Sequence, residues 1–215
     1  MKIGIKLSQF IATDLFLGFS IRNWDPRINY FLLGKRYTYN FFNVNLTYLF
    51  LKKAVFILNN TLSKNGTLWV VAENFVTLNK LSSFYSYLKN EKIFKFGDWP
   101  NGLLTNYKYI DKYSVFPHAV FLLNLAHNTY AGNEAMVIGV PVLSLIDSCE
   151  NPRGSFYPIP SNSKSLSSAM FYLLLIFRLL IKNRLEAMRT YKLLIRARRK
   201  FNILPYLGSL GLLTK

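Results

Sequence analysis

The stretch from Ile146 to Asn162, IDSCENPRGSFYPIPSN, contains residue types that could carry out chemistry. Asp147 and Glu150 lie three residues apart, and paired carboxylates can act as general acid and general base. A thiol, Cys149, stands between them. The competing interpretation is turn formation, because an aspartate at the end of a strand, followed by Ser and Asn-Pro, is ordinary turn chemistry. We favour the turn.

Nucleophilic catalysis would need Cys149 beside a base, and the chain contains two histidines, His118 and His127. No nucleophile elbow surrounds this cysteine, and a lone cysteine is more often inert packing. The three residues also lack the ligand spacing of a zinc site. After the apolar run Leu68–Val71 the sequence reads AENFVT, without the glycines that cradle a nucleotide phosphate. We therefore expect no catalytic residue, no metal, no cofactor and no small-molecule substrate.

The charge balance is the strongest signal in the composition. The chain has 27 lysines and arginines against 10 aspartates and glutamates, a net charge of +17 over 215 residues. An enzyme that acts on neutral metabolites has no need of such a field. Its sign favours a polyanionic partner, either a nucleic acid or the anionic face of a membrane.

The first basic group lies near the N-terminus and is interleaved with aromatic residues. Its cations are Arg22, Arg27, Lys35 and Arg36, and its aromatic residues are Trp24, Tyr30, Tyr37 and Tyr39. Cationic groups contact phosphates while flat side chains stack on unpaired bases, so this mixture favours RNA. A solvated loop above core aromatics is the alternative.

The second basic group occupies the C-terminal segment. It consists of Lys182, Arg184, Arg189, Lys192, Arg196, Arg198, Arg199 and Lys200, with Glu186 as the only acidic residue among them. A solvated helix face usually mixes both signs, so this density favours an anionic partner, with a membrane surface as the competitor to RNA. We expect no membrane insertion, because the apolar run Ala169–Ile181 is shorter than the roughly 20 residues of a span and contains Arg178.

Strands and helices that would position these groups alternate along the chain. Short apolar strands at Leu68–Val71, Ala119–Leu123 and Val142–Ile146 should be adjacent, parallel and buried. We also predict an extended run at Tyr37–Val44 and a strand at Ile93–Phe96. One helix should begin at a cap formed by Asn45 or Thr47 and end at Asn65-Gly66. The other predicted helices are at 6–17, 75–92, 128–139 and 163–200. The alternation predicts an α/β fold with helices on both faces of a parallel sheet.

Three stretches together resemble one family. They are WDPRINYFLLGKR at 24–36, WPNGLLTNYK at 99–108, and the long segment at 118–173. In the last of these, Glu134-Ala135, Gly-Val-Pro, a strand ending in Asp147, Asn-Pro and Pro-Ile-Pro follow in order. From about Leu17 to Leu180 the chain resembles the S-two family of small-subunit ribosomal proteins, in an organellar form.

The resemblance implies a Rossmann-like (flavodoxin-like) sheet and a non-enzymatic structural constituent of the mitochondrial small ribosomal subunit, working in translation. It implies binding to small-subunit rRNA and to neighbouring ribosomal proteins near the head–body junction. The rRNA-binding candidates are Arg22, Arg27, Lys35, Arg36, Lys108, Arg184, Arg189, Arg196, Arg198 and Arg199. We expect a Rossmann-like domain at 1–181 and a basic C-terminal extension at 182–215.

The chain also departs from the family pattern. The family usually has a histidine where Phe19 follows Gly18, basic residues at Glu73-Asn74, and His-Arg at Gly97-Asp98. Only YKYIDKYSVFPH separates Asn106 from Ala119, so the coiled-coil hairpin that bacterial members insert there is expected to be absent. Two alternatives stay open: a degenerate Rossmann-like enzyme or RNA-modifying factor, and a basic peripheral membrane protein.

Overall fold

The computed structural model describes residues 7–72, 93–96, 99–106 and 116–201. Its centre is a five-stranded parallel sheet in the order β5-β4-β6-β7-β8. The strands are β4 (Leu68–Val71), β5 (Ile93–Phe96), β6 (Ala119–Leu122), β7 (Val142–Ile146) and β8 (Tyr157–Pro160). Numbered within the sheet this order is 2-1-3-4-5, the flavodoxin-like arrangement. The prediction of three adjacent, parallel, buried strands is confirmed, because β6 pairs with both β4 and β7.

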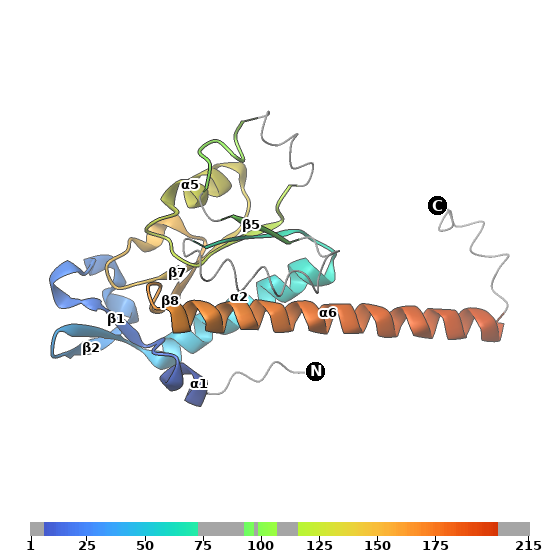
Figure 1. The fold of residues 1–215 in the computed structure, drawn as a ribbon, viewed down its shortest axis with the longest axis horizontal. Coiled ribbons are helices and arrows are strands. Elements are labelled where there is room, and N and C mark those ends of the chain that lie inside the picture. Colours follow the sequence, from blue (N-terminus) through green and yellow to red (C-terminus); the bar gives the residue numbers. More distant parts are fainter. Residues whose placement is uncertain (1–6, 73–92, 97–98, 107–115, 202–215) are drawn as a thin grey trace.

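Helices cover both faces of this sheet, as the alternation predicts (Figure 1). Successive strand residues point to opposite faces, so that Phe121 of β6 belongs to one core and Val120 to the other. The first core is completed by α2 (Val44–Ser63) and by the first half of α6 (Leu166–Phe201). The second core is completed by α5 (Thr129–Ile138).

The residue that caps α2 differs from the prediction. Asn43 is the N-cap, and its side chain accepts a hydrogen bond from the N–H of Asn45 at 3.1 Å. The predicted end of α2 at Asn65-Gly66 is confirmed within two residues, since Ser63 is its last helical residue and Asn65 has a left-handed φ of 57°. The helix predicted at 75–92 lies outside the described residues.

The α5 helix ends as its sequence indicates, with Gly139 at φ 83°. It also holds a neighbouring loop. Glu134 accepts hydrogen bonds from the backbone N–H groups of Gly102 at 2.6 Å and Leu104 at 3.1 Å, one on each carboxylate oxygen. These bonds fasten the segment at 99–106 to the second core, where Leu104 is buried.

The N-terminal region is a small antiparallel sheet of order β1-β3-β2. Its elements are β1 (Leu17–Ser20), the 3-10 turns η1 (Ile21–Asn23) and η2 (Pro26–Phe31), β2 (Leu32–Arg36) and β3 (Tyr39–Phe42). We call residues 17–42 the N-terminal module. The sequence indicates only an extended run at Tyr37–Val44, because β2 is short, exposed and contains a glycine, which leaves no alternating apolar pattern to detect.

The first helix is shorter than predicted. The structure places α1 at Leu7–Ala12, whereas the prediction runs to Leu17. Asp14 takes a left-handed conformation with φ 51°, which ends the helical path, and Leu17 is already the first residue of β1.

The proline-rich stretch after β7 contains a strand that the sequence does not suggest. Pro158 and Pro160 belong to β8, which lies at the edge of the sheet. Alternate residues of a strand direct their N–H groups to opposite sides, and Ser161 N–H donates to Ile146 O at 3.0 Å. The two prolines therefore face away from β7, where a missing N–H removes no ladder bond.

The long helix α6 packs on the first core over its first half. Among its described side chains the last buried one is Leu180, and the helix continues past the sheet (Figure 1). The boundary predicted between residues 181 and 182 therefore lies inside one continuous helix. The division into two domains stays a prediction.

Candidate nucleic-acid interface

The N-terminal module is held at the carboxyl end of β7. The backbone N–H of Phe19 donates to Asp147 Oδ1 at 2.9 Å and to Ser148 Oγ at 2.8 Å. The backbone N–H of Asp25 donates to the carbonyl oxygen of Ser148 at 2.9 Å. The end of β7 thus satisfies backbone donors of a segment that lies far away in the sequence.

The contact between the two parts is close-packed. Asn40 of β3 is fully buried and donates from Nδ2 to Phe19 O at 3.1 Å and to Ser148 Oγ at 3.5 Å. A Cβ atom at Gly18 would come within 3.0 Å of Ser148 Oγ and 3.2 Å of Asn40 O. A side chain at this position would therefore press on Ser148 and on the backbone of Asn40, and glycine fits the close approach.

The outer surface of the module carries the first basic group. Lys35 Nζ lies 4.4 Å from the centroid of the Trp24 ring, and the Arg36 guanidinium carbon lies 5.6 Å from that of Tyr37. Both contacts are cation–π interactions that hold the charges at the surface. The structure thus brings Lys35 to Trp24 and Arg36 to Tyr37.

The other two cations of this group are also exposed. Arg27 lies 3.3 Å from Asp25, whose carboxylate also accepts from the Arg27 backbone N–H and so caps η2. Arg22 is exposed on η1, where Ser20 accepts from its backbone N–H at 3.4 Å. All four predicted cations of the N-terminal module are therefore exposed. Among these four, Arg27 is the one that forms an ion pair with a described carboxylate, that of Asp25.

The second basic group lies on the part of α6 that extends past the sheet. Arg184 and Arg189 belong to this part of α6 and are exposed. Arg196, Arg198 and Arg199 lie on the same helix, but their side chains are outside the described residues, as is the whole of Lys108. The structure therefore leaves the RNA-binding role of every candidate a prediction.

The helix α6 is long and apolar enough over Leu166–Leu193 to cross a membrane by length and composition alone. In the structure 44% of the most apolar window is buried inside the protein. Leu173, Ile176 and Leu179 belong to the first core. A core helix of this kind passes the same test as a membrane span.

The carboxylates after β7 are bound internally. Glu150 Oε1 accepts from Ser163 Oγ at 2.8 Å, and Oε2 accepts from the Asp147 N–H at 3.2 Å. The Glu150 N–H donates back to Asp147 O at 3.1 Å, so the predicted turn is confirmed. Burial raises the pKa of Glu150 to about 7 and also raises the pKa of Asp147.

Cys149 is placed unfavourably for nucleophilic catalysis. Burial, followed by the nearby Asp147 carboxylate, raises the pKa of its thiol, whereas an activated cysteine needs a lowered one. His118 stands at the other end of its strand, one residue before β6, and its Nδ1 accepts from the Thr67 N–H at 3.2 Å. His118 and Cys149 therefore do not meet as a nucleophile and its base.

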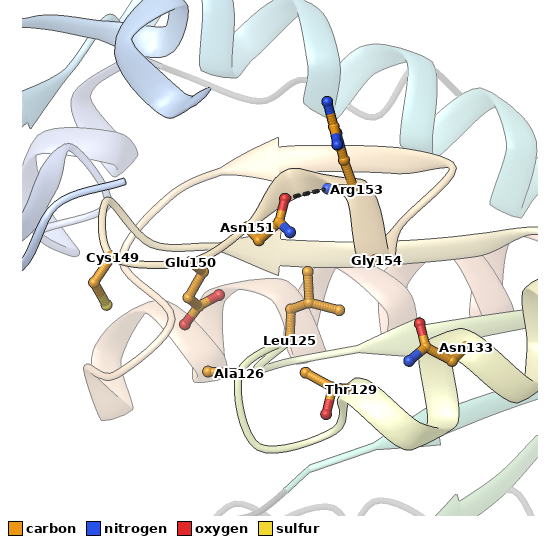
Figure 2. A pocket seen from close by; sticks show the side chains of 9 residues that line it. All are labelled: Leu125, Ala126, Thr129, Asn133, Cys149, Glu150, Asn151, Arg153 and Gly154. Atoms are coloured by element: carbon orange, nitrogen blue, oxygen red, sulfur yellow. Dashed lines mark hydrogen bonds between the residues drawn. The ribbon is translucent and has the colours of Figure 1, made fainter. Parts of the chain in front are cut away.

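A cavity of about 350 Å³ lies at the carboxyl ends of β6 and β7 (Figure 2). Its lining includes Leu125, Thr129, Glu150 and Arg153. Figure 2 shows the Arg153 side chain pointing away from the Glu150 carboxylate. Ligands of a 2-1-3-4-5 sheet bind at its topological switch point, which here is the gap between β4 and β6. The cavity lies one strand away from that position.

Comparison with known proteins connects this fold to a family. The family model "Ribosomal protein S2" matches residues 107–182. The chain is 42% identical over 187 residues to the small ribosomal subunit protein uS2m of Acanthamoeba castellanii, covering 85% of this chain. The chain belongs to the ribosomal protein S2 family. It spans 60% of the length of the Acanthamoeba protein.

Two more distant relatives extend the comparison. The uS2m protein of Schizosaccharomyces pombe is 26% identical over 184 residues, which are 75% of this chain and 69% of that protein. The uS2 protein of Colwellia psychrerythraea is 20% identical over 213 positions, which cover 79% of this chain and 87% of that protein. The alignment is longer than the part of this S2 chain that it covers. The bacterial protein therefore has stretches that have no counterpart in this chain. The segment at 107–115, where the hairpin is expected to be absent, lies outside the described residues.

The sequence does not predict the contact between the N-terminal module and the carboxyl end of β7, which positions the first basic group. The sequence indicates Asp147 and Ser148 only as local turn formers and gives no sign of their bonds to Phe19 and Asp25. The one available signal is Gly18, because a glycine in a strand often marks a close approach of another backbone.

Proposed function

We infer that this S2 chain is a structural constituent of the mitochondrial small ribosomal subunit, where it binds small-subunit rRNA and neighbouring ribosomal proteins in translation. The observation that carries this inference is its 42% identity, over 85% of its length, to a small ribosomal subunit protein named uS2m. The second uS2m relative, from Schizosaccharomyces pombe, supports the mitochondrial location.

The electrostatics support RNA as the main partner. The net charge of +17 is concentrated partly on the exposed cations of the N-terminal module and partly on the second half of α6. Phosphate contacts of this kind fix the position of a protein without reading sequence. The proposed contacts are Arg22, Arg27, Lys35, Arg36, Lys108, Arg184, Arg189, Arg196, Arg198 and Arg199.

A structural role, without catalysis, agrees with how the carboxyl ends of the strands are used. In enzymes of this fold class that edge holds substrate. Here the end of β7 binds the chain's own Phe19 and Asp25, and the carboxylates of Asp147 and Glu150 accept internal hydrogen bonds. These groups are committed to the fold.

Sedimentation of mitochondrial lysate through a sucrose gradient in moderate salt tests this function. The tagged full chain should migrate with the small ribosomal subunit and shift when the subunit is dissociated. Migration at the top of the gradient would indicate a free enzyme or RNA-modifying factor. Recovery with lipid, in a floating fraction, would indicate a peripheral membrane protein that uses α6.

Salt dependence tests the individual cations. A cation that binds one phosphate contributes about one unit to the slope of log affinity against log salt concentration, so its replacement should flatten the slope by that amount. Arg36→Gln and Arg22→Gln should each show this change for rRNA fragments. A slope equal to that of the unmodified chain removes the replaced residue from the interface.

A further inference from the structure

The tip of the β2–β3 hairpin carries an aromatic residue where the backbone disfavours one. Arg36 pairs with Tyr39, so that Tyr37 and Thr38 form a two-residue connection. Tyr37 has φ 53°, a left-handed conformation that such turns usually assign to glycine, asparagine or aspartate. A bulky residue in this conformation is strained, and strain of this kind is concentrated at functional positions.

Packing does not explain this residue. The Tyr37 side chain is 87% exposed, and its described ring contact is with the neighbouring Arg36 guanidinium. A ring that buries so little apolar surface gains little free energy to offset a strained backbone. We therefore infer that the Tyr37 ring contacts a binding partner.

The surroundings of Tyr37 suit an unpaired nucleotide. Directly opposite residues of antiparallel strands share a face, so Tyr39, which is 53% exposed, lies beside Arg36. Gly34 lies two residues before Arg36 and therefore on the same face, where an added Cβ would meet nothing within 4 Å. Together these residues offer two aromatic rings, a guanidinium group and open space beside bare backbone.

We propose that Tyr37 stacks on an unpaired base of RNA while Arg36 contacts the adjoining phosphate. This proposal rests on the proposed RNA-binding function and adds the class of RNA that the N-terminal module binds, which is single-stranded and not duplex. A nucleic acid is favoured over a protein loop because Lys35 and Arg36 precede the ring and residues 32–42 contain no acidic residue. Stacking tolerates any sequence, since every base has a π-face.

Replacement of Tyr37 by glycine separates binding from folding. Tyr37→Gly removes the ring and also relieves the strained φ, so the melting temperature of the full chain should stay equal or rise. Its affinity for a single-stranded RNA of about 16 nucleotides should fall about tenfold, while its affinity for a duplex of the same sequence stays unchanged. Tyr37→Phe keeps the ring and should retain affinity. Tyr130→Ala, which removes another exposed tyrosine on α5, is the matched control.

The outcomes distinguish this proposal from the function on which it rests. If the full chain binds neither RNA, the RNA-binding function fails and the stacking fails with it. If Arg36→Gln weakens binding and Tyr37→Gly does not, the cations contact RNA and the stacking alone is wrong. Replacing Tyr37 by p-benzoylphenylalanine in assembled subunits adds a direct readout. A crosslink to RNA supports the proposal, and a crosslink to a neighbouring protein overturns it.

Discussion

The backbone N–H of Phe19 donates a 2.9 Å hydrogen bond to the carboxylate of Asp147 at the carboxyl end of β7. In doubly wound sheets the carboxyl ends of the strands are where ligands bind. In this S2 protein the end of β7 binds the N-terminal module and holds its cations in place. A strand end with the residue types of an active site here binds another segment of the same chain.

Removal of the anchor should loosen the N-terminal module. Asp147→Ala removes the carboxylate oxygen that accepts from the half-buried Phe19 N–H and from the Ser148 N–H, so the free energy of unfolding should fall by about 1–3 kcal/mol, although the Phe19 N–H keeps its bond to Ser148 Oγ. Asp147→Asn keeps an acceptor oxygen and should cost less. Amide hydrogen exchange at Phe19 is the direct measurement. Equal protection of this amide in the alanine variant and in the unmodified chain would mean that the bond to Ser148 Oγ suffices, and would contradict the anchoring role of Asp147.

The contact between α5 and the loop after β7 should be intolerant of one methyl group. A Cβ at Gly132 would lie 2.7 Å from the carbonyl oxygen of Gly154. Gly132→Ala should therefore destabilise the protein by about 1–3 kcal/mol in denaturant unfolding, although alanine has the better helix propensity. Gly34→Ala, where the new Cβ meets nothing within 4 Å, is the control. A more stable Gly132→Ala variant would show that this contact is misplaced.

The buried carboxylate of Glu150 should make stability depend on pH. Its folded-state pKa of about 7 lies above the ordinary 4.5, because burial disfavours the charged form. Because the folded pKa is raised, the contribution of the neutral Glu150 carboxyl group to the free energy of unfolding is fully present below pH 4.5. This contribution is lost as the pH rises through about 7. The stability of the unmodified chain relative to Glu150→Gln should therefore fall by up to about 3 kcal/mol between about pH 5 and pH 8.

Chemical unfolding at several pH values measures this difference. Glu186→Gln on α6 is the control, because it replaces an exposed carboxylate that lies 3.9 Å from Lys182. A constant difference between Glu150→Gln and the unmodified chain across this range would mean that Glu150 is solvated.

The sequence predicts local features of this protein better than its long-range contacts. The apolar runs of β4, β6 and β7 identify buried parallel strands, and Gly139 marks the end of α5, because burial and chain reversal leave local signatures. The bond between Phe19 and Asp147 joins residues 128 positions apart, and no local pattern encodes it. Prolines are compatible with a strand only at certain positions, such as the edge of a sheet. That β8 lies at the edge follows from the whole sheet and not from its own sequence, so a prediction based on composition misses this strand.

Cys149 should be dispensable for both folding and assembly. Its thiol is partly buried, and its raised pKa keeps it protonated and unreactive near neutral pH. Cys149→Ala should leave migration with the small subunit unchanged and alter the free energy of unfolding by less than about 1 kcal/mol. Loss of an enzymatic turnover in this variant would refute the structural role.

The most direct measurement of the central claim is an electron cryomicroscopy structure of the mitochondrial small subunit that contains this chain. We expect Arg22, Arg27, Lys35 and Arg36 within salt-bridge reach of rRNA phosphates. The module that carries them should still be bound to the end of β7. We also expect Arg196, Arg198 and Arg199 beside phosphates or an acidic protein partner. Maps in which the N-terminal module faces solvent, or in which this chain is absent from the subunit, would contradict the claim.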